Sequence, residues 1–215
     1  MRLLDLFAGE LGWSKVFAAR GHHCICVDLK IPKQAPKGCD IVRCDVLELK
    51  IKDGWFWVTG QKYVRVEYFD AIVASSPCEE FSTLRNFRPP VIYPAMGVKL
   101  FNHTRELCEA SGLPYVMENV AGAMRYVGKA VHHCGPFYLW GNAVPPLMPQ
   151  GIRKGLTALV MGCRERKGQQ GWNDRGTGKK GQNDTAKVAT IPPELANCVC
   201  DYMERILLDK KKAAS

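Results

Sequence analysis

Short, almost wholly apolar segments alternate with amphipathic segments through residues 2–120, and this alternation constrains the fold more than any other feature. The apolar segments, each ending at a glycine turn or a polar residue, are 2–7, 23–28, 39–45, 70–75 and 114–118. Segments 13–20 and 94–111 have helical spacing, and Gly112 ends the second of them. Strands that are apolar on both faces and joined by helices indicate a parallel sheet that is covered on both sides. The sequence therefore predicts an α/β fold with a doubly wound, mostly parallel sheet and helices on both faces.

Residues 53–69 interrupt this alternation. Aromatic and β-branched residues stand on both sides of the string Thr59-Gly60-Gln61-Lys62; they are Trp55, Trp57, Tyr63, Val64, Val66 and Tyr68. Two such runs around a glycine turn predict an inserted hairpin with its turn near Gly60. We interpret it as an edge hairpin packed on the sheet rather than as a binding element.

The charge of the chain is strongly positive and unevenly distributed. The formal net charge is +9, and residues 150–190 hold nine basic residues, three acidic residues and eight glycines. A positive excess of this size favours a polyanionic partner, nucleic acid first. Beyond this segment, Leu195, Val199, Tyr202 and Ile206 recur at helical spacing and predict a closing helix.

The chain is expected to be cytoplasmic and to have no membrane partner. No apolar run reaches the length of a transmembrane helix, and Asp5 interrupts the first apolar run, where a secretory signal needs an unbroken one. The ten cysteines include no Cys-x-x-Cys pair, so we expect reduced thiols and no metal site. Segments 22–26 and 132–134 combine histidine with cysteine, and we interpret them as strand residues and loop caps rather than as ligands.

Three motifs place polar or reactive residues at the ends of predicted strands. The first, residues 4–14 (LDLFAGELGWS), is a strand, a turn that contains Gly9 and Gly12, and the start of a helix. Glycines at such a turn let a cofactor approach the backbone closely, and the next two strands end on Asp28 and Asp45 at the same edge. A carboxylate at the end of the second strand suits ribose hydroxyls.

The other two motifs follow the fourth and fifth strands. Residues 75–82 (SSPCEEFS) place Cys78 at the ligand-binding edge, where a thiol acts either as a nucleophile or as a buried, inert side chain. The string Glu118-Asn119-Val120 ends the fifth strand. A glutamate at that point is a poor packing choice and a suitable acid or hydrogen-bond partner for a substrate.

These three strings, in this order and at these distances, resemble the DNA (cytosine-5) methyltransferase family. The resemblance covers residues 4–120, about half of the chain, and the closing helix is loosely similar to the family's C-terminal element. It implies a Rossmann-like methyltransferase fold with S-adenosylmethionine as cofactor. It also implies three regions, which are a catalytic and cofactor-binding domain at 1–140, a small basic nucleic-acid-contacting segment at 141–189, and a helix at 190–215 that returns to the first domain.

The resemblance assigns roles to individual residues. Cys78 would add to carbon 6 of cytosine, so that carbon 5 becomes nucleophilic enough to take the methyl group. Glu118 would hold the exocyclic amine and share a proton with ring nitrogen 3, and the cytosine would flip out of a DNA duplex. Asp28 would bind the ribose, and the other cofactor contacts would be Phe7, Ala8, Gly9, Gly12, Asp45, Val46, Pro77 and Asn197. The expected DNA contacts are Ser82, Arg85, Arg88, Asn119, Arg164, Arg166 and Trp172.

The sequence departs from the family pattern in four ways. Leu11 stands where a glycine is usual, and Glu79 follows the cysteine where glutamine is common, although a carboxylate beside a thiolate opposes its ionisation. No Gln-x-Arg-x-Arg string follows Glu118-Asn119-Val120, and Arg164 and Arg166 are the candidates by pattern for the arginine that polarises the base. Residues 141–189 replace a large target-recognition region; they can neutralise phosphates but offer few rigid side chains that read bases.

These departures leave the substrate and the activity open at this point. We expect a monomer with short-site specificity, or one that depends on a protein partner for specificity. The same chemistry on RNA is one alternative. A catalytically weak or inactive homologue that binds DNA is the other, motivated by Glu79 and the missing arginine string, whereas the presence of both Cys78 and Glu118 favours an enzyme.

Overall fold

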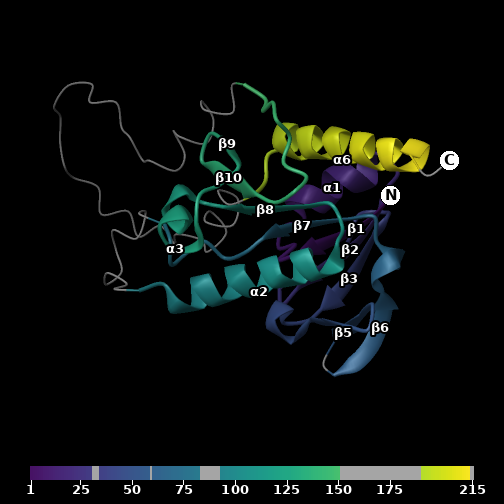
Figure 1. Ribbon diagram of the computed structural model, residues 1–215, viewed down its shortest axis with the longest axis horizontal. Coiled ribbons are helices and arrows are strands. Elements are labelled where there is room, and N and C mark those ends of the chain that lie inside the picture. The colour runs from purple at the N-terminus through teal and green to yellow at the C-terminus, as the bar shows by residue number, and fades with distance from the viewer. Residues whose placement is uncertain (31–33, 59, 83–92, 151–189, 214–215) are drawn as a thin grey trace, which may run out of the picture.

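Seven strands form the central sheet of the computed structural model, which describes residues 1–30, 34–58, 60–82, 93–150 and 190–213. Five parallel strands come first in the sheet order; they are β3 (Cys39–Arg43), β2 (His23–Asp28), β1 (Arg2–Leu6), β7 (Ala71–Ser75) and β8 (Tyr115–Asn119). The sheet is completed by β10 (Phe137–Trp140), antiparallel to β8, and by β9 (His132–Cys134), a hairpin that the sequence pattern did not predict. The expected α/β fold with a mostly parallel sheet is confirmed (Figure 1).

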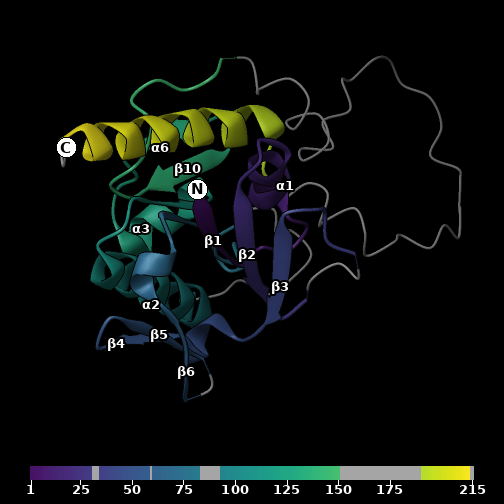
Figure 2. The ribbon, with the colours of Figure 1, turned by 90° about the vertical axis from the view of Figure 1, so that its right-hand side faces the viewer.

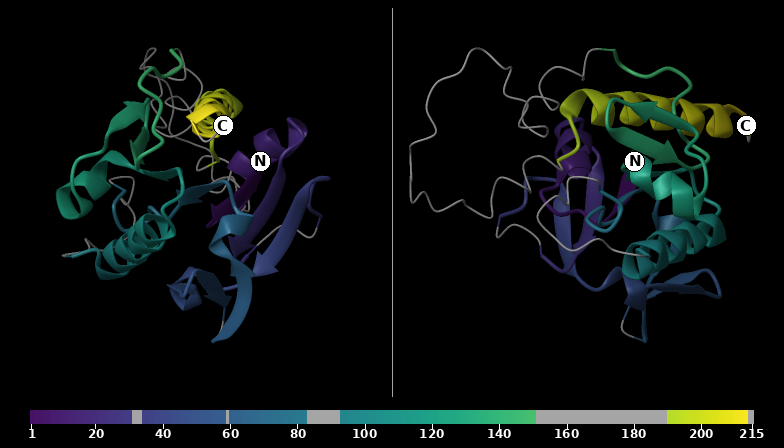
Figure 3. Two further views of the ribbon diagram at one scale, coloured as in Figure 1. Left: turned by 45° about the vertical axis from the view of Figure 1, so that its right-hand side comes forward. Right: turned by 90° about the vertical axis from the view of Figure 1, so that its left-hand side faces the viewer.

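Helices cover both faces of this sheet because successive residues of each buried strand point to opposite sides. On one side, Leu3, Val73 and Val116 share a buried cluster with residues of α1 (Gly12–Ala19) and α6 (Pro193–Ala213). On the other side, Leu4, Ile72 and Met117 pack with residues of α2 (Ala95–Ser111), which ends at Gly112 as predicted. The short helix α3 (Met124–Val127) follows β8, and Figure 3 shows α6 and α2 on opposite sides of the sheet.

The insertion between β3 and β7 forms a sheet of its own. After the short 3-10 helix η1 (Val46–Glu48), strands β4 (Lys50–Lys52), β5 (Trp55–Val58) and β6 (Gln61–Arg65) pair in order and antiparallel (Figure 2). A second 3-10 helix, η2 (Val66–Tyr68), leads into β7. The inserted hairpin around Gly60 is therefore confirmed. It gains a third strand and forms a sheet separate from the main one. Phe56 on its inner face lies in one buried cluster with Leu4 and Ile25 of the main sheet, so the expectation that the hairpin packs on that sheet is also confirmed.

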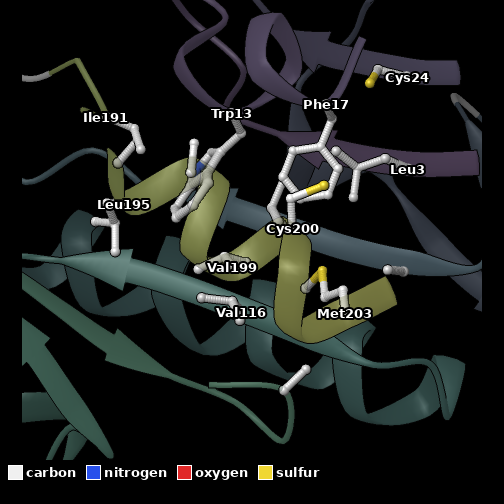
Figure 4. Close-up of a cluster of buried hydrophobic side chains, with 14 of the residues drawn as sticks. Leu3, Trp13, Phe17, Cys24, Val116, Ile191, Leu195, Val199, Cys200 and Met203 are labelled. Atoms are coloured by element: carbon white, nitrogen blue, oxygen red, sulfur yellow. The ribbon is translucent and has the colours of Figure 1, made fainter. Parts of the chain in front are cut away.

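The C-terminal helix α6 packs along α1, and its buried residues are Leu195, Ala196, Val199, Cys200 and Met203 (Figure 4). The expected closing helix is confirmed; of the residues that predicted it, Leu195 and Val199 are fully buried and Tyr202 is half-buried, while Met203 is also fully buried. Residues four apart lie one above the other on a helix, so the buried stripe continues from Val199 to Met203. None of the helices in the described part of the chain is both long and apolar enough to cross a membrane.

Candidate functional site

The predicted site residues gather at the carboxyl ends of the five parallel strands. In sheet order, Asp45 follows β3, Asp28 ends β2, the turn 7–12 follows β1, Cys78 follows β7, and Glu118 and Asn119 end β8. The chain builds outwards from β1 through β2 to β3 on one side and through β7 to β8 on the other. The strand order thus reverses between β1 and β7, and in open α/β sheets ligands bind at such a reversal. The residues expected to hold a cofactor lie mainly on the β3-β2-β1 side, and the two expected catalytic residues lie on the β7-β8 side.

The turn after β1 has the backbone geometry of a glycine-rich turn. Phe7, Gly9 and Leu11 all have positive φ, at 58°, 47° and 61°. The left-handed conformation at Leu11 explains why a glycine suits this position, and here the fully buried leucine side chain offsets the strain. The amide of Ala8 donates to the carbonyl of Val27 over 3.1 Å, which ties the turn to β2.

Asp28 is joined to this turn by a hydrogen bond and lies beside Gly9. The Gly9 amide donates to Asp28 Oδ2 over 3.0 Å, and the Lys30 amide donates to Oδ1 over 2.8 Å. A Cβ on Gly9 would lie 3.9 Å from Asp28 Oδ2, so any longer side chain there would compete with a ligand for this carboxylate. A carboxylate beside a glycine, which has no side chain, fits the ribose of a nucleoside-containing cofactor.

The other expected cofactor contacts have varied roles. The Asp45 carboxylate accepts from the Leu47 amide over 2.9 Å and caps η1. Val46 is buried, and its carbonyl lies 2.9 Å from His103 Nε2 on α2. Ala8 is buried at the turn, and Pro77 is exposed in the loop after β7.

Gly12 and Asn197 differ from their expected roles. A Cβ on Gly12 would lie 2.9 Å from the Ile191 backbone nitrogen, so this glycine allows the chain before α6 to approach α1 rather than lining a ligand site. Asn197 lies beside Arg20, just beyond the other end of α1, and donates to the Pro193 carbonyl of its own helix over 2.9 Å. Ile191, which the motifs did not single out, is the residue of this segment that reaches the turn.

Cys78 lies in a tight turn after β7. The amides of Phe81 and Ser82 both donate to its carbonyl over 3.0 Å, and its side chain is half-buried. Burial raises the pKa of the Cys78 thiol to about 11, and the carboxyl groups of Glu118 and Glu79 add to this rise. The thiol is therefore neutral in the free protein at neutral pH, and it becomes a nucleophile only when its proton leaves during the reaction.

Glu118 lies opposite Ser75 across the β7–β8 pair, and its side chain is buried. Burial raises the pKa of the Glu118 carboxyl to about 7, against the lowering effect of a hydrogen bond with the Ser75 side chain. Ser75 Oγ also accepts from Trp13 Nε1 over 3.0 Å. A buried carboxyl that titrates near neutral pH can both give and take a proton, as a general acid–base group must.

Asn119 is placed differently from its expected role as a DNA contact. It is fully buried, and its Nδ2 donates to both the carbonyl and Oγ of Ser76 over 3.0 Å. Its Oδ1 accepts from the Val120 amide over 2.8 Å. The side chain therefore fixes the Ser76–Cys78 loop to β8 and is not exposed to a nucleic acid.

The remaining DNA-contact candidates divide into two groups. Ser82 lies half-buried in the Cys78 turn. Arg85, Arg88, Arg164, Arg166 and Trp172 lie outside the described residues.

Sequence reasoning missed three residues that position the site, which are Trp13, Ser75 and Ser76. All three lie in the motif strings, yet their positioning roles depend on neighbouring strands, and no local pattern distinguishes them from ordinary packing residues.

One group of possible metal ligands lies outside this edge. In the described ranges, His22, Cys200 and Glu204 each place a ligand atom within 4.8 Å of the others. Glu204 is already paired with Arg20 over 2.6 Å and with His22 over 2.7 Å, and the guanidinium charge opposes a bound cation. We interpret the group as the clamp that holds α6 to α1. The nine cysteines among the described residues are free thiols, in line with the expectation of reduced cysteines.

One open pocket lies away from the motif residues. It has a volume of about 380 Å³ and is lined by Arg105, Glu109, Tyr115, Val127, Lys129 and Trp140, among others. Tyr115 begins β8, whereas Glu118 is near its end. This pocket therefore lies toward the amino end of the strand, and we assign it no part in the chemistry at the carboxyl edge.

The fold and the site define an α/β protein with the Cys78 thiol, the buried Glu118 carboxyl and the turn-bound Asp28 carboxylate at the carboxyl edge of a mostly parallel sheet. Comparison of the sequence with known protein families and with curated proteins found no match.

Proposed function

We propose that this chain transfers a methyl group from S-adenosylmethionine to carbon 5 of cytosine in DNA. The observation that supports this most strongly is the placement of Cys78 and Glu118 on neighbouring strand ends, next to the Gly9–Asp28 turn. A nucleophile, an acid and a nucleoside-type site meet there at one sheet edge. The sequence resemblance supplies the identity of the reaction.

In the proposed reaction, the Cys78 thiol gives its proton to water as Sγ forms a bond to carbon 6, and the electron pair of the C5–C6 double bond moves to carbon 5, which uses it to bond the methyl group. The cofactor, when bound, supplies that electrophilic methyl group. Glu118 gives a proton to ring nitrogen 3 and thereby neutralises the charge that develops on the ring. Transfer of the carbon-5 proton to water then re-forms the C5–C6 double bond and expels Sγ as a thiolate, while ring nitrogen 3 returns its proton to Glu118 and the thiolate takes up a proton from water. The target base has to leave the helical stack for Sγ to reach its face.

The groups of this chain would divide the work as follows. Asp28 would accept hydrogen bonds from the ribose hydroxyls while Gly9 leaves room for them. Asn119 and Ser76 would hold the Cys78 loop, and Ser75 with Trp13 would orient Glu118. The positive net charge of the chain favours a nucleic acid over a free nucleotide as the substrate.

The test is methyl transfer from labelled S-adenosylmethionine to duplex DNA, single-stranded DNA and RNA. We expect label to be recovered as 5-methylcytosine from DNA, and Cys78→Ser to abolish it. Cys198→Ser, which alters another half-buried thiol on α6, is the matched control and should retain activity. Transfer that survives in Cys78→Ser would contradict the proposed nucleophile, and label found in RNA alone would reassign the substrate.

A second candidate function is DNA binding without methyl transfer. It is favoured by the raised pKa of the Cys78 thiol, to which Glu79 contributes. If no substrate takes up label while the wild-type chain binds both cofactor and DNA, this second function replaces the first.

A further inference from the structure

The outer face of the three-stranded sheet β4-β5-β6 combines two tryptophans with four basic side chains. The strand register brings Lys50, Trp57 and Lys62 into one row and Lys52, Trp55 and Arg65 into the next. Directly paired residues share a face of an antiparallel sheet, and so do residues two apart on one strand, so all six lie on one side. We call these six residues the Trp–Lys face.

This face is turned away from the core. Ile51, Phe56 and Val64 form the intervening row, Phe56 is buried, and the other two pack against the α2-side cluster. On the Trp–Lys face the four basic residues are exposed and the two indoles are half-exposed. Figures 1 and 2 both place this small sheet on the opposite side of the molecule from α6. Packing against the core therefore does not account for two tryptophans here.

Three of the four basic side chains lie over the indole rings. Lys62 Nζ is 5.4 Å from the Trp55 ring centre and 5.9 Å from that of Trp57. The Arg65 guanidinium is 5.2 Å from the Trp55 ring centre, and Lys52 Nζ is 6.0 Å from that of Trp57. Cations over aromatic rings at an exposed site gain only about 0.5–1 kcal/mol each. The basic side chains can therefore leave the indole rings and bind another partner at a small cost in free energy.

The charge of this face is positive after its acidic neighbours are counted. Arg65 pairs with Glu67 over 3.0 Å, and Asp53 stands in the turn between β4 and β5. Lys50, Lys52 and Lys62 lie along the two edge strands, on either side of the tryptophans of β5. A flat aromatic centre bordered by two rows of cations matches the chemistry of a single nucleic-acid strand, whose bases stack and whose phosphates pair.

We propose that the Trp–Lys face binds single-stranded nucleic acid, with bases stacked on Trp55 and Trp57 and phosphates held by Lys52 and Lys62. This site is separate from the carboxyl edge of the main sheet. The inference deepens the proposed function, on which it rests for nucleic acid as the partner, by adding a second contact with the strand. An acidic protein segment is the competing occupant, and it lacks the planar groups that would use the indoles.

The test measures binding of a fluorescein-labelled oligothymidylate of about twelve nucleotides, which covers one such platform and contains no cytosine. The double variant Lys52→Gln/Lys62→Gln should weaken binding about tenfold or more. It should also reduce the slope of log affinity against log salt concentration by about 1.4 in magnitude. The control Lys129→Gln/Lys210→Gln removes two exposed charges elsewhere and should change the affinity less than about twofold. Trp57→Leu should weaken binding at least about fivefold, and Trp57→Phe should retain most of it.

Equal losses in the two double variants, or wild-type affinity in Lys52→Gln/Lys62→Gln, would overturn the inference. Competition by polyglutamate as effective as that by unlabelled oligothymidylate would also overturn it. Melting curves establish that each variant is folded, and Trp57→Phe keeps the stacking argument testable if Trp57→Leu is unstable. Since the probe cannot be methylated, a chain without methyl transfer that shows these losses supports this site while refuting the proposed function.

Discussion

Two groups with raised pKa values, the half-buried Cys78 thiol and the buried Glu118 carboxyl, determine how the proposed chemistry depends on pH. The pKa is about 11 for the Cys78 thiol and about 7 for the Glu118 carboxyl, and burial is the main cause of both shifts. The reactive form combines a thiolate with a protonated Glu118. Below pH 7 the carboxyl is already protonated and the thiolate share rises tenfold per pH unit. Between the two pKa values, the fraction of Cys78 that is thiolate still rises with pH, but the fraction of Glu118 that is protonated falls by the same factor, so their product stays constant.

We therefore predict that methyl transfer rises with pH up to about 7 and then levels off. In Glu118→Gln the proton donor is lost, so the rate should fall by about 10²- to 10⁴-fold and continue to rise above pH 7. Single-turnover rates between about pH 5 and 9 measure this profile. Glu79→Gln, which changes an exposed neighbour of Cys78, is the control and should keep the break near 7. A break that persists in Glu118→Gln would assign the titration to another group.

Among the elements, α6 depends on a small polar clamp as well as on its apolar stripe. Arg20, which ends α1, pairs with both Asp201 and Glu204 over 2.6 Å. His22 Nε2 lies 2.7 Å from the other oxygen of Glu204, and burial lowers the pKa of this histidine. This clamp lies at the C-terminal end of α1. At the N-terminal end, Ile191 makes a second close contact, with Gly12. These two points set the position of α6 along α1.

Replacing Glu204 with alanine should destabilise the fold by about 1–3 kcal/mol, because Arg20 and the mostly buried His22 each lose one partner, while His22 keeps the Met1 amine at Nδ1. Urea unfolding followed by circular dichroism gives this difference. Glu106→Ala removes an exposed glutamate from the surface of α2 and should change stability by less than about 0.5 kcal/mol. Equal effects of the two substitutions would show that the clamp contributes nothing beyond helix propensity.

For the molecule as a whole, the reversal of strand order separates the residues proposed to bind the cofactor from those proposed to act on the base. Asp28 ends β2 and holds the turn after β1, whereas Cys78 follows β7 and Glu118 lies near the end of β8. The two sets lie on opposite sides of the reversal and share no side-chain hydrogen bond among those described at this edge. Substitutions on one side should therefore affect one ligand more than the other.

Asp28→Asn should weaken binding of S-adenosylmethionine about tenfold or more, because the substitution turns one acceptor oxygen into an N–H donor. The remaining side-chain oxygen can still accept the hydrogen bond from the Gly9 amide. Cys78→Ser should leave this affinity within about twofold of the wild type. Isothermal titration with each variant measures both, and binding of duplex DNA to Asp28→Asn should be unchanged. If Asp28→Asn binds the cofactor normally, Asp28 is only a structural support of the turn.

Most of the central sheet could be predicted from local pattern because its strands are buried on both faces. Such strands are almost wholly apolar and end abruptly, which is why 23–28 and 70–75 match β2 and β7 within a residue. Strands β9 and β10 escaped prediction because they are short and contain His132, His133 and Tyr138. The third strand of the insertion escaped for the same reason, since β4 has only three residues, of which two are lysines.

At the site, the sequence by itself determined which residues end the strands, and hence that Asp28, Asp45, Cys78 and Glu118 stand at one edge. That follows from chain order, because parallel strands bring their carboxyl ends together. Only the tertiary structure decided what each side chain does there. It buried Asn119 as a brace for the Cys78 loop, set Ile191 rather than Asn197 against the turn, and turned Trp55 and Trp57 outward. Burial and hydrogen bonding come from residues distant in the chain, and a local pattern of residue types does not contain them.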